Sequence, residues 1–72
     1  MLDRVIKSTV DCLKDMYNCF ITVTDGGNST YMDVMPLPYV PNVSRLIRVD
    51  ISATNKYQVC NNMYNWFEKE FK

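Results

Sequence analysis

The sequence predicts a two-layer α+β domain, a three-stranded antiparallel sheet with two helices packed on one face, in the order helix, strand, strand, strand, helix. Three observations predict it. Apolar residues recur at helical spacing at both ends of the chain. In three segments between these two ends, apolar residues occupy every second position. No connection is long enough for a parallel crossover. The 72 residues make a single small domain, 1–72, whose 47% hydrophobic content argues against disorder.

The first helix is predicted over residues 2–17. Its apolar side consists of Leu2, Val5, Ile6, Thr9, Val10, Leu13, Met16 and Tyr17. Asp3 lies near the start, where a carboxylate stabilises the positive end of the helix dipole, and its spacing from Lys7 predicts an ion pair. Asn18 tolerates the left-handed backbone that commonly ends a helix.

Two strands joined by a tight turn should follow. In residues 19–24 and 29–35, aromatic, β-branched and other apolar residues alternate between two faces. The intervening Asp25-Gly26-Gly27-Asn28 supplies residues that tolerate positive φ, a strong hairpin signal. The outward-facing residues of the two strands would be Phe20, Thr22, Thr24, Tyr31, Asp33 and Met35.

A third strand is predicted over residues 44–52, after a stiff loop. The Pro-Leu-Pro-Tyr-Val-Pro segment, 36–41, cannot be a central strand because its prolines remove ladder donors. In the third strand Leu46, Arg48 and Asp50 would face outward. The predicted inward set of the whole sheet is Ile21, Val23, Met32, Val34, Ile47, Val49 and Ile51.

The last helix should begin near Asn55, where Asn55 and Gln58 resemble a capping box. From Tyr57 to Lys72 it carries five of the nine aromatic residues. The centre of its apolar arc, predicted to be core, contains Cys60, Met63, Phe67 and Phe71. The borders hold Tyr57 and Tyr64 on one side, and Trp66 with Val59 on the other. Tyrosine and tryptophan are frequent in binding interfaces, so Tyr57, Tyr64 and Trp66 are candidate contact residues, with edge packing as the alternative.

Catalytic, cofactor and metal sites are not expected. The chain has no histidine, which removes the usual general base and a common metal ligand. Asp33 and Asp50 on adjacent strands could hold a cation or act as an acid/base pair, but beside Arg48 they are more typical of a solvated charge pattern. Gly26-Gly27 lacks the lysine and the strand-to-helix context of a phosphate loop. The protein is therefore not expected to be an enzyme.

The charge balance and the cysteines indicate which partners and which cellular compartment to expect. Eight basic and eight acidic residues leave no net charge, which makes nucleic acid an unlikely partner and mildly favours self-association. Cys12, Cys19 and Cys60 have no C-x-x-C spacing and are expected to be reduced thiols at apolar positions, with Cys12 and Cys60 able to meet between the helices. The segment 2–10 is too short and charged for a signal or membrane segment, so a cytoplasmic location without membrane association is expected.

The outer face of the sheet is the main candidate contact surface. The alternation that directs Ile21 and Val49 inward leaves other large side chains uncovered if both helices lie on one face. These are Phe20, Tyr31, Met35, Leu46 and Arg48. The alternative is that the proline-rich loop, with Leu37, Tyr39 and Val40, folds across this face and forms a minor core.

The expected function is a non-enzymatic protein-binding module whose partner is another protein or a second copy. In size and composition the chain resembles small accessory proteins of phages and mobile elements, which implies an inhibitor of a host enzyme or defence complex. A second hypothesis is nucleic-acid binding, because the element order is similar to that of double-stranded-RNA-binding domains. That resemblance implies a lysine cluster at the start of the last helix, where this chain has only Lys56. A homo-oligomeric structural role is the third hypothesis.

Overall fold

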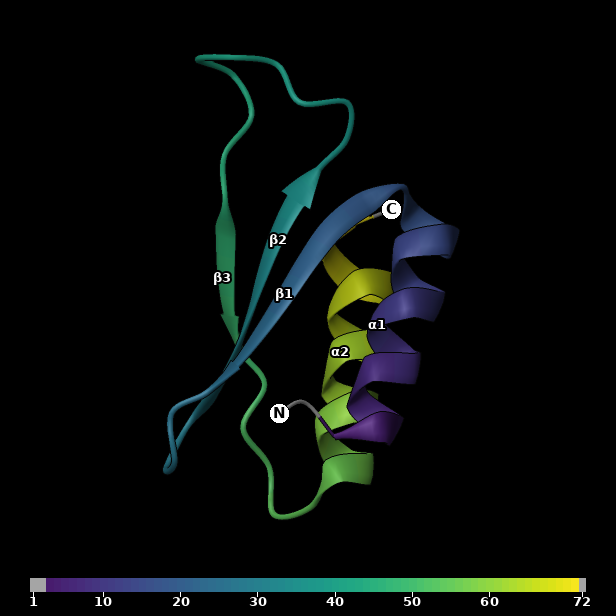
Figure 1. Cartoon of the computed structure of the whole chain (residues 1–72). Coiled ribbons are helices and arrows are strands. Elements are labelled where there is room, and N and C mark those ends of the chain that lie inside the picture. The colour runs from purple at the N-terminus through teal and green to yellow at the C-terminus, as the bar shows by residue number, and fades with distance from the viewer. Residues whose placement is uncertain (1–2, 72) are drawn as a thin grey trace.

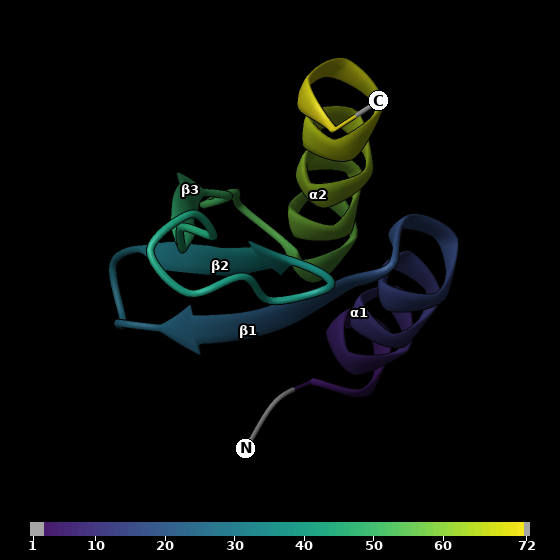
Figure 2. The ribbon, with the colours of Figure 1, turned by 90° about the horizontal axis from the view of Figure 1, so that it is seen from above.

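The computed structural model describes residues 3–71, which form a two-layer α+β domain (Figure 1). The elements in order are α1 (Arg4–Tyr17), β1 (Cys19–Asp25), β2 (Thr30–Pro36), β3 (Ile47–Asp50) and α2 (Lys56–Glu70). The strands form one antiparallel sheet in the order β1-β2-β3, and both helices lie on the same side of it (Figure 2). The predicted fold class is confirmed. Predictions for Leu2 and Lys72 fall outside the described residues.

Both helices begin at polar residues that the sequence indicates, and α1 also ends at one. The Asp3 side chain caps α1 by accepting a hydrogen bond of 2.8 Å from the Val5 N–H, and Asn18 ends the helix in the left-handed region, with φ 49°. Asn55 caps α2 by accepting from the Gln58 N–H at 3.0 Å. Only this half of the predicted capping box forms, because the Gln58 side chain bonds the Thr54 hydroxyl instead.

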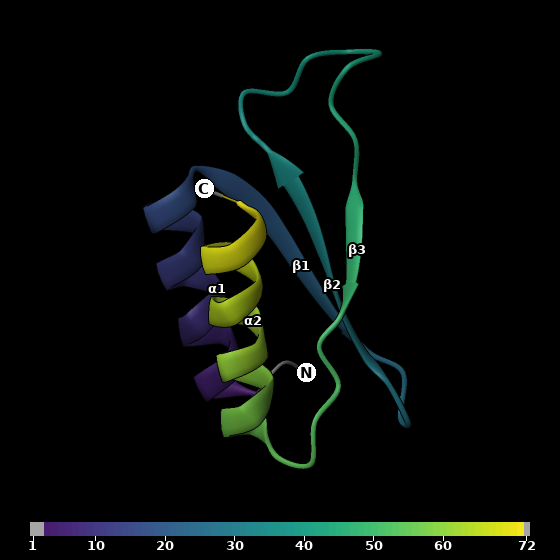
Figure 3. The same ribbon diagram turned by 180° about the vertical axis from the view of Figure 1, so that it is seen from behind.

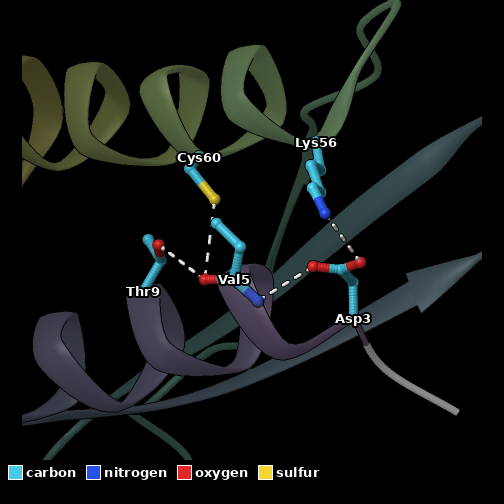
Figure 4. Close-up of polar contacts among 5 residues, drawn as sticks. All are labelled: Asp3, Val5, Thr9, Lys56 and Cys60. Atoms are coloured by element: carbon cyan, nitrogen blue, oxygen red, sulfur yellow. Dashed lines mark hydrogen bonds and ion pairs between the residues drawn. The ribbon is translucent and has the colours of Figure 1, made fainter.

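The predicted ion pair between Asp3 and Lys7 is wrong. Lys7 pairs with Asp11 one turn further on, at 3.4 Å. Asp3 is the cap residue, outside the helix proper, and its carboxylate lies 3.7 Å from the Nζ of Lys56 at the start of α2 (Figure 4). The contact joins the N-terminal ends of the two helices.

The hairpin and the register of the sheet follow the predicted alternation. Asp25 accepts a hydrogen bond from the Gly27 N–H at 3.0 Å, and Gly27 has a φ of 88°, which only glycine adopts without strain. The third strand is shorter than the predicted 44–52. Ser44 is held in the loop by Val40, and at the other end Asp50 accepts from the Ser52 N–H, which turns the chain toward α2.

The core lies between the helices and the inner face of the sheet. Its buried side chains are Val10, Leu13, Cys19, Ile21, Met32, Val34, Ile51, Val59, Met63 and Phe67. Ile47, predicted to be core, is 39% exposed. It is the first residue of the edge strand, so it has a strand neighbour on one side only, although Val34 opposite it is fully buried. Val23 and Val49 are half-buried.

The two helices run side by side in the same direction (Figures 1 and 3). At their N-terminal halves the Cys60 Sγ lies 3.8 Å from the Val5 carbonyl oxygen, which also accepts from the Thr9 hydroxyl at 3.0 Å (Figure 4). At their C-terminal ends Tyr17 stacks on Phe67, with ring centroids 4.9 Å apart. Aromatic and sulfur contacts therefore join the helices along most of their length.

Four sequence assignments on the helices need correction. Met16, placed on the apolar side of the first helix, is 59% exposed. Val59, placed at the border of α2, is buried in the core. Cys12, placed at an apolar position between the helices, is exposed. Phe71, placed in the core, is half-buried at the last turn, where it packs edge-on against Tyr17. Residue spacing gives the apolar side of a helix but not the exact limits of the buried stripe, which depend on how the two helices pack against each other.

Candidate partner-binding surface

No helix covers the outer face of the sheet, and its side chains form cross-strand rows. In the middle row Thr22, Asp33 and Arg48 lie on three adjacent strands. The row toward the hairpin contains Thr24, Tyr31 and Asp50. At the opposite end of the sheet Phe20 pairs with Met35, and Leu46 lies just before β3.

The middle row is held by an ion pair. The Arg48 Nε donates to Asp33 Oδ1 at 2.9 Å and Nη2 donates to Oδ2 at 3.3 Å, while the guanidinium lies 5.4 Å from the centroid of the Tyr31 ring. The hydrogen bond that Arg48 donates to the Asp33 carboxylate raises the pKa of Arg48. Asp33 and Asp50 lie on adjacent strands of the outer face, as predicted, but in different rows, and the partner of Asp33 is Arg48. Asp33 is a buried carboxylate that Arg48 neutralises.

The end of the outer face beyond this row is apolar. Phe20 is 55% exposed and Leu46 is 58% exposed, while Met35 between them is half-buried. The Lys14 ammonium lies 5.3 Å from the Phe20 ring centroid, which gives this end a positive charge at its border. Phe20, Met35 and Leu46 are thus the predicted contact residues that lie beside the loop.

The loop between β2 and β3, residues 37–46, extends beyond the end of the sheet instead of folding across it (Figures 1 and 3). The predicted alternative of a minor core under this loop is therefore wrong. Its large apolar side chains are at least 42% exposed, and Val43 reaches 70%. We call the exposed apolar set at this end the loop-end surface, and it consists of Phe20, Leu37, Tyr39, Val40, Val43 and Leu46.

Hydrogen bonds and prolines hold the loop in shape. The Val40 carbonyl accepts from the N–H groups of Val43 and Ser44 at 3.1 and 2.8 Å, and the Ser44 hydroxyl accepts from the Val40 N–H at 2.8 Å. At the base the Leu37 N–H donates to the Asn18 carbonyl at 3.2 Å. Two prolines of the loop, Pro38 and Pro41, fix further φ angles. A segment that is already ordered loses less conformational entropy when it binds.

The candidates on α2 lie on a different part of the molecule. Tyr57 is 62% exposed, and Tyr64 is 36% exposed beside Cys12 of α1. Partial burial, followed by the contact with Cys12, raises the pKa of Tyr64. Trp66 is half-buried and packs edge-on against Phe67, with centroids 5.0 Å apart, so it belongs to the edge of the core. The structure does not bring these residues together with the outer-face candidates.

Val43 is the one residue of the loop-end surface that sequence reasoning did not single out. It lies between Asn42, which adopts a φ of 68°, and Ser44, in a segment with no apolar periodicity. A β-branched residue between two turn-forming polar residues was the only available signal. That pattern indicates an apolar side chain at the tip of a turn, where burial is difficult.

Across residues 3–71 there is no pocket, and no three cysteine or acidic side chains lie close enough together to hold a metal ion. Neither helix within the described part of the chain has the length and apolar character needed to cross a membrane. No protein-family model, curated protein or solved structure matches the chain.

Proposed function

We propose that this protein is a non-enzymatic binding module that engages another protein through the loop-end surface. The observation that carries the proposal is that six exposed large apolar side chains gather at one end of the sheet, in a domain of only 72 residues. Apolar side chains exposed singly are ordinary, whereas apolar patches of several hundred Å² are typical of interaction sites. Their position on a projecting, hydrogen-bonded loop suits entry into a concave surface.

Charge favours a protein partner over nucleic acid. The Lys56 ammonium, which the resemblance to double-stranded-RNA-binding domains would assign to phosphate binding, lies 3.7 Å from the carboxylate of Asp3. Arg48 is likewise paired with Asp33. Without a cluster of unpaired basic side chains, the main source of nucleic-acid affinity is missing from these positions.

More narrowly, we propose that the protein is an inhibitor that acts in the cytoplasm by occupying the surface of a host enzyme or defence complex. An ordered apolar loop presented away from the body of a small domain is suited to that role because it can enter a cleft without unfolding. The three cysteines are all free thiols, which fits a reducing compartment.

The Val43→Asp variant tests the proposal. Val43 is 70% exposed, so a carboxylate there should leave the fold intact and should weaken partner binding at least tenfold, because a charge would be buried at an apolar interface. The measurement is affinity purification of tagged protein from its native host, followed by binding of the recovered partner to purified variants. Far-UV circular dichroism confirms that each variant is folded.

Met16→Asp is the matched control, since Met16 is 59% exposed on α1 and outside the loop-end surface. It should bind like the unmodified protein. Tyr57→Asp examines the border of α2 in the same assay. If Val43→Asp binds normally and Tyr57→Asp does not, the partner surface is on α2 and the loop-end assignment is wrong.

A further inference from the structure

Strand β3 is an edge of the sheet with unpaired backbone groups. The Ile51 N–H donates to the Thr30 carbonyl at 2.9 Å, which fixes the phase of the ladder between β2 and β3. Because the direction of hydrogen bonding alternates along an antiparallel strand, Ile47 and Val49 bond to β2. The N–H and C=O groups of Arg48 and Asp50 therefore point away from the sheet, and no other strand of the described chain pairs with them.

This edge lacks most of the features that normally prevent strand addition. It contains no proline, lysine or bulge, and its protection is limited to its short length of four residues and two charged side chains of opposite sign. On the inner face beside the edge Ile47 is 39% exposed and Val49 is half-buried. On the outer face the edge carries two opposite charges, Arg48 and Asp50, two residues apart. An added strand could therefore contact apolar side chains on the inner face of this edge and charged side chains on its outer face.

We propose that a second copy of the chain pairs with this edge, β3 against β3 in antiparallel orientation, about a two-fold axis through Val49. In this register Arg48 lies opposite Asp50 of the second copy, and the symmetry forms the same pair twice. The two neighbouring registers that also match outward-pointing backbone groups place Arg48 opposite Arg48, or Asp50 opposite Asp50. Like charges directly opposite each other destabilise a strand pair, so the sequence of β3 selects one register.

The apolar face of β3 agrees with the same register. Val49 meets Val49 of the second copy on the axis, and Ile47 lies opposite Ile51 of the second copy, which covers part of its exposed side chain. Arg48 retains its bond to Asp33, because a guanidinium has five N–H donors and that bond uses two of them. Zero net charge also gives little repulsion between copies.

The inferred dimer goes beyond the proposed function and uses a different part of the molecule. Pairing two copies of a three-stranded sheet edge to edge gives a continuous six-stranded sheet. Because the paired strands are antiparallel, the two loop-end surfaces lie at opposite ends of that sheet. The dimer would therefore present two partner sites facing away from each other.

Light scattering with size exclusion tests the dimer. The unmodified protein should approach twice the chain mass of 8.4 kDa as its concentration rises. Asp50→Lys, which places two positive charges opposite each other, should raise the dissociation constant at least tenfold. Asp15→Lys is the matched control because it makes the same charge change at an exposed residue of α1, and it should have no effect. A mass of 8.4 kDa at the highest concentration overturns the proposal.

Cross-linking tests the register itself. A non-hydrogen-bonded antiparallel pair has Cα atoms about 4.5 Å apart, within the range for a disulfide. Val49→Cys, in a Cys12→Ser background, should form a disulfide-linked dimer on oxidation, whereas Ile47→Cys should not. Preferential cross-linking of Ile47→Cys would overturn the register. Val43→Asp separates the two proposals, since loss of the dimer in that variant but not in Asp50→Lys would mean that the loop, and not β3, joins the copies.

Discussion

Replacing Phe67 by alanine is expected to leave the domain largely unfolded at room temperature. Phe67 is fully buried, and its ring lies about 5 Å from the rings of Tyr17, Trp66 and Phe71. A phenylalanine-to-alanine change in a core costs about 3–5 kcal/mol, and a domain of this size has a net stability of about 3–5 kcal/mol. The change should therefore remove most of the free energy of unfolding. Urea titration followed by far-UV circular dichroism measures the loss.

Phe20→Ala is the matched control for this experiment. The same atoms are removed, but Phe20 is 55% exposed on the outer sheet face, and its closest aromatic interaction is with the Lys14 ammonium. The expected loss is below about 1 kcal/mol. If both substitutions cost the same, the aromatic cluster at the end of the helices does not form the packed core described above.

Leu13→Ala is expected to cost about 2–5 kcal/mol, the usual range for a fully buried leucine. Alanine has at least as high a helix propensity as leucine, so the loss would report packing against the core and not a weaker α1. Equilibrium unfolding in urea gives the free-energy difference. Its size within the range depends on how far neighbouring side chains move into the cavity.

Met16→Ala is the control on the same helix, one turn further along. Met16 is 59% exposed, and its truncation should change the free energy of unfolding by no more than about 0.5 kcal/mol. Equal losses for Leu13→Ala and Met16→Ala would mean that α1 presents a different side to the sheet.

The elements of this fold could be predicted because their ends depend on local chemistry. Asn18 adopts the left-handed conformation that stops α1, and Asn55 accepts the hydrogen bond that starts α2. Gly27 supplies the positive φ of the hairpin. Each signal acts within three residues of its effect, so each was visible without knowledge of the tertiary structure.

The errors arise where contacts join distant parts of the chain. Alternation places Ile47 on the inner face, but it does not show that the strand lies at the edge, where the side chain remains 39% exposed. The Asp3 carboxylate had a suitable partner four residues away, yet it lies beside Lys56. Prolines predicted that 36–41 is not a strand, which is wrong only for Pro36, the last residue of β2, and they contain no information on the direction in which the loop leaves the sheet.

For the candidate contact residues too, the sequence predicted what depends on local structure but not what depends on distant contacts. Alternation correctly placed Phe20, Tyr31, Met35 and Arg48 on one uncovered face, because side-chain direction in a strand has a fixed period. Which of them are available to a partner depends on their neighbours. The Arg48 guanidinium lies over the Tyr31 ring and pairs with Asp33, whereas Phe20, beside Met35 and the Lys14 ammonium, remains 55% exposed. Exposure was therefore decided by cross-strand contacts that a single sequence does not reveal.

The packing of the first helix against the last one also sets the order in which the molecule can be made. Val5 contacts Cys60, and Tyr17 stacks on Phe67, so α1 finds its partner only when residues about fifty positions later have been synthesised. At roughly 5–20 residues per second, translation separates Tyr17 from Phe67 by about 3–10 s. During that interval the hairpin can form and α1 can pack against β1, but the part of α1 that contacts α2 still lacks its partner.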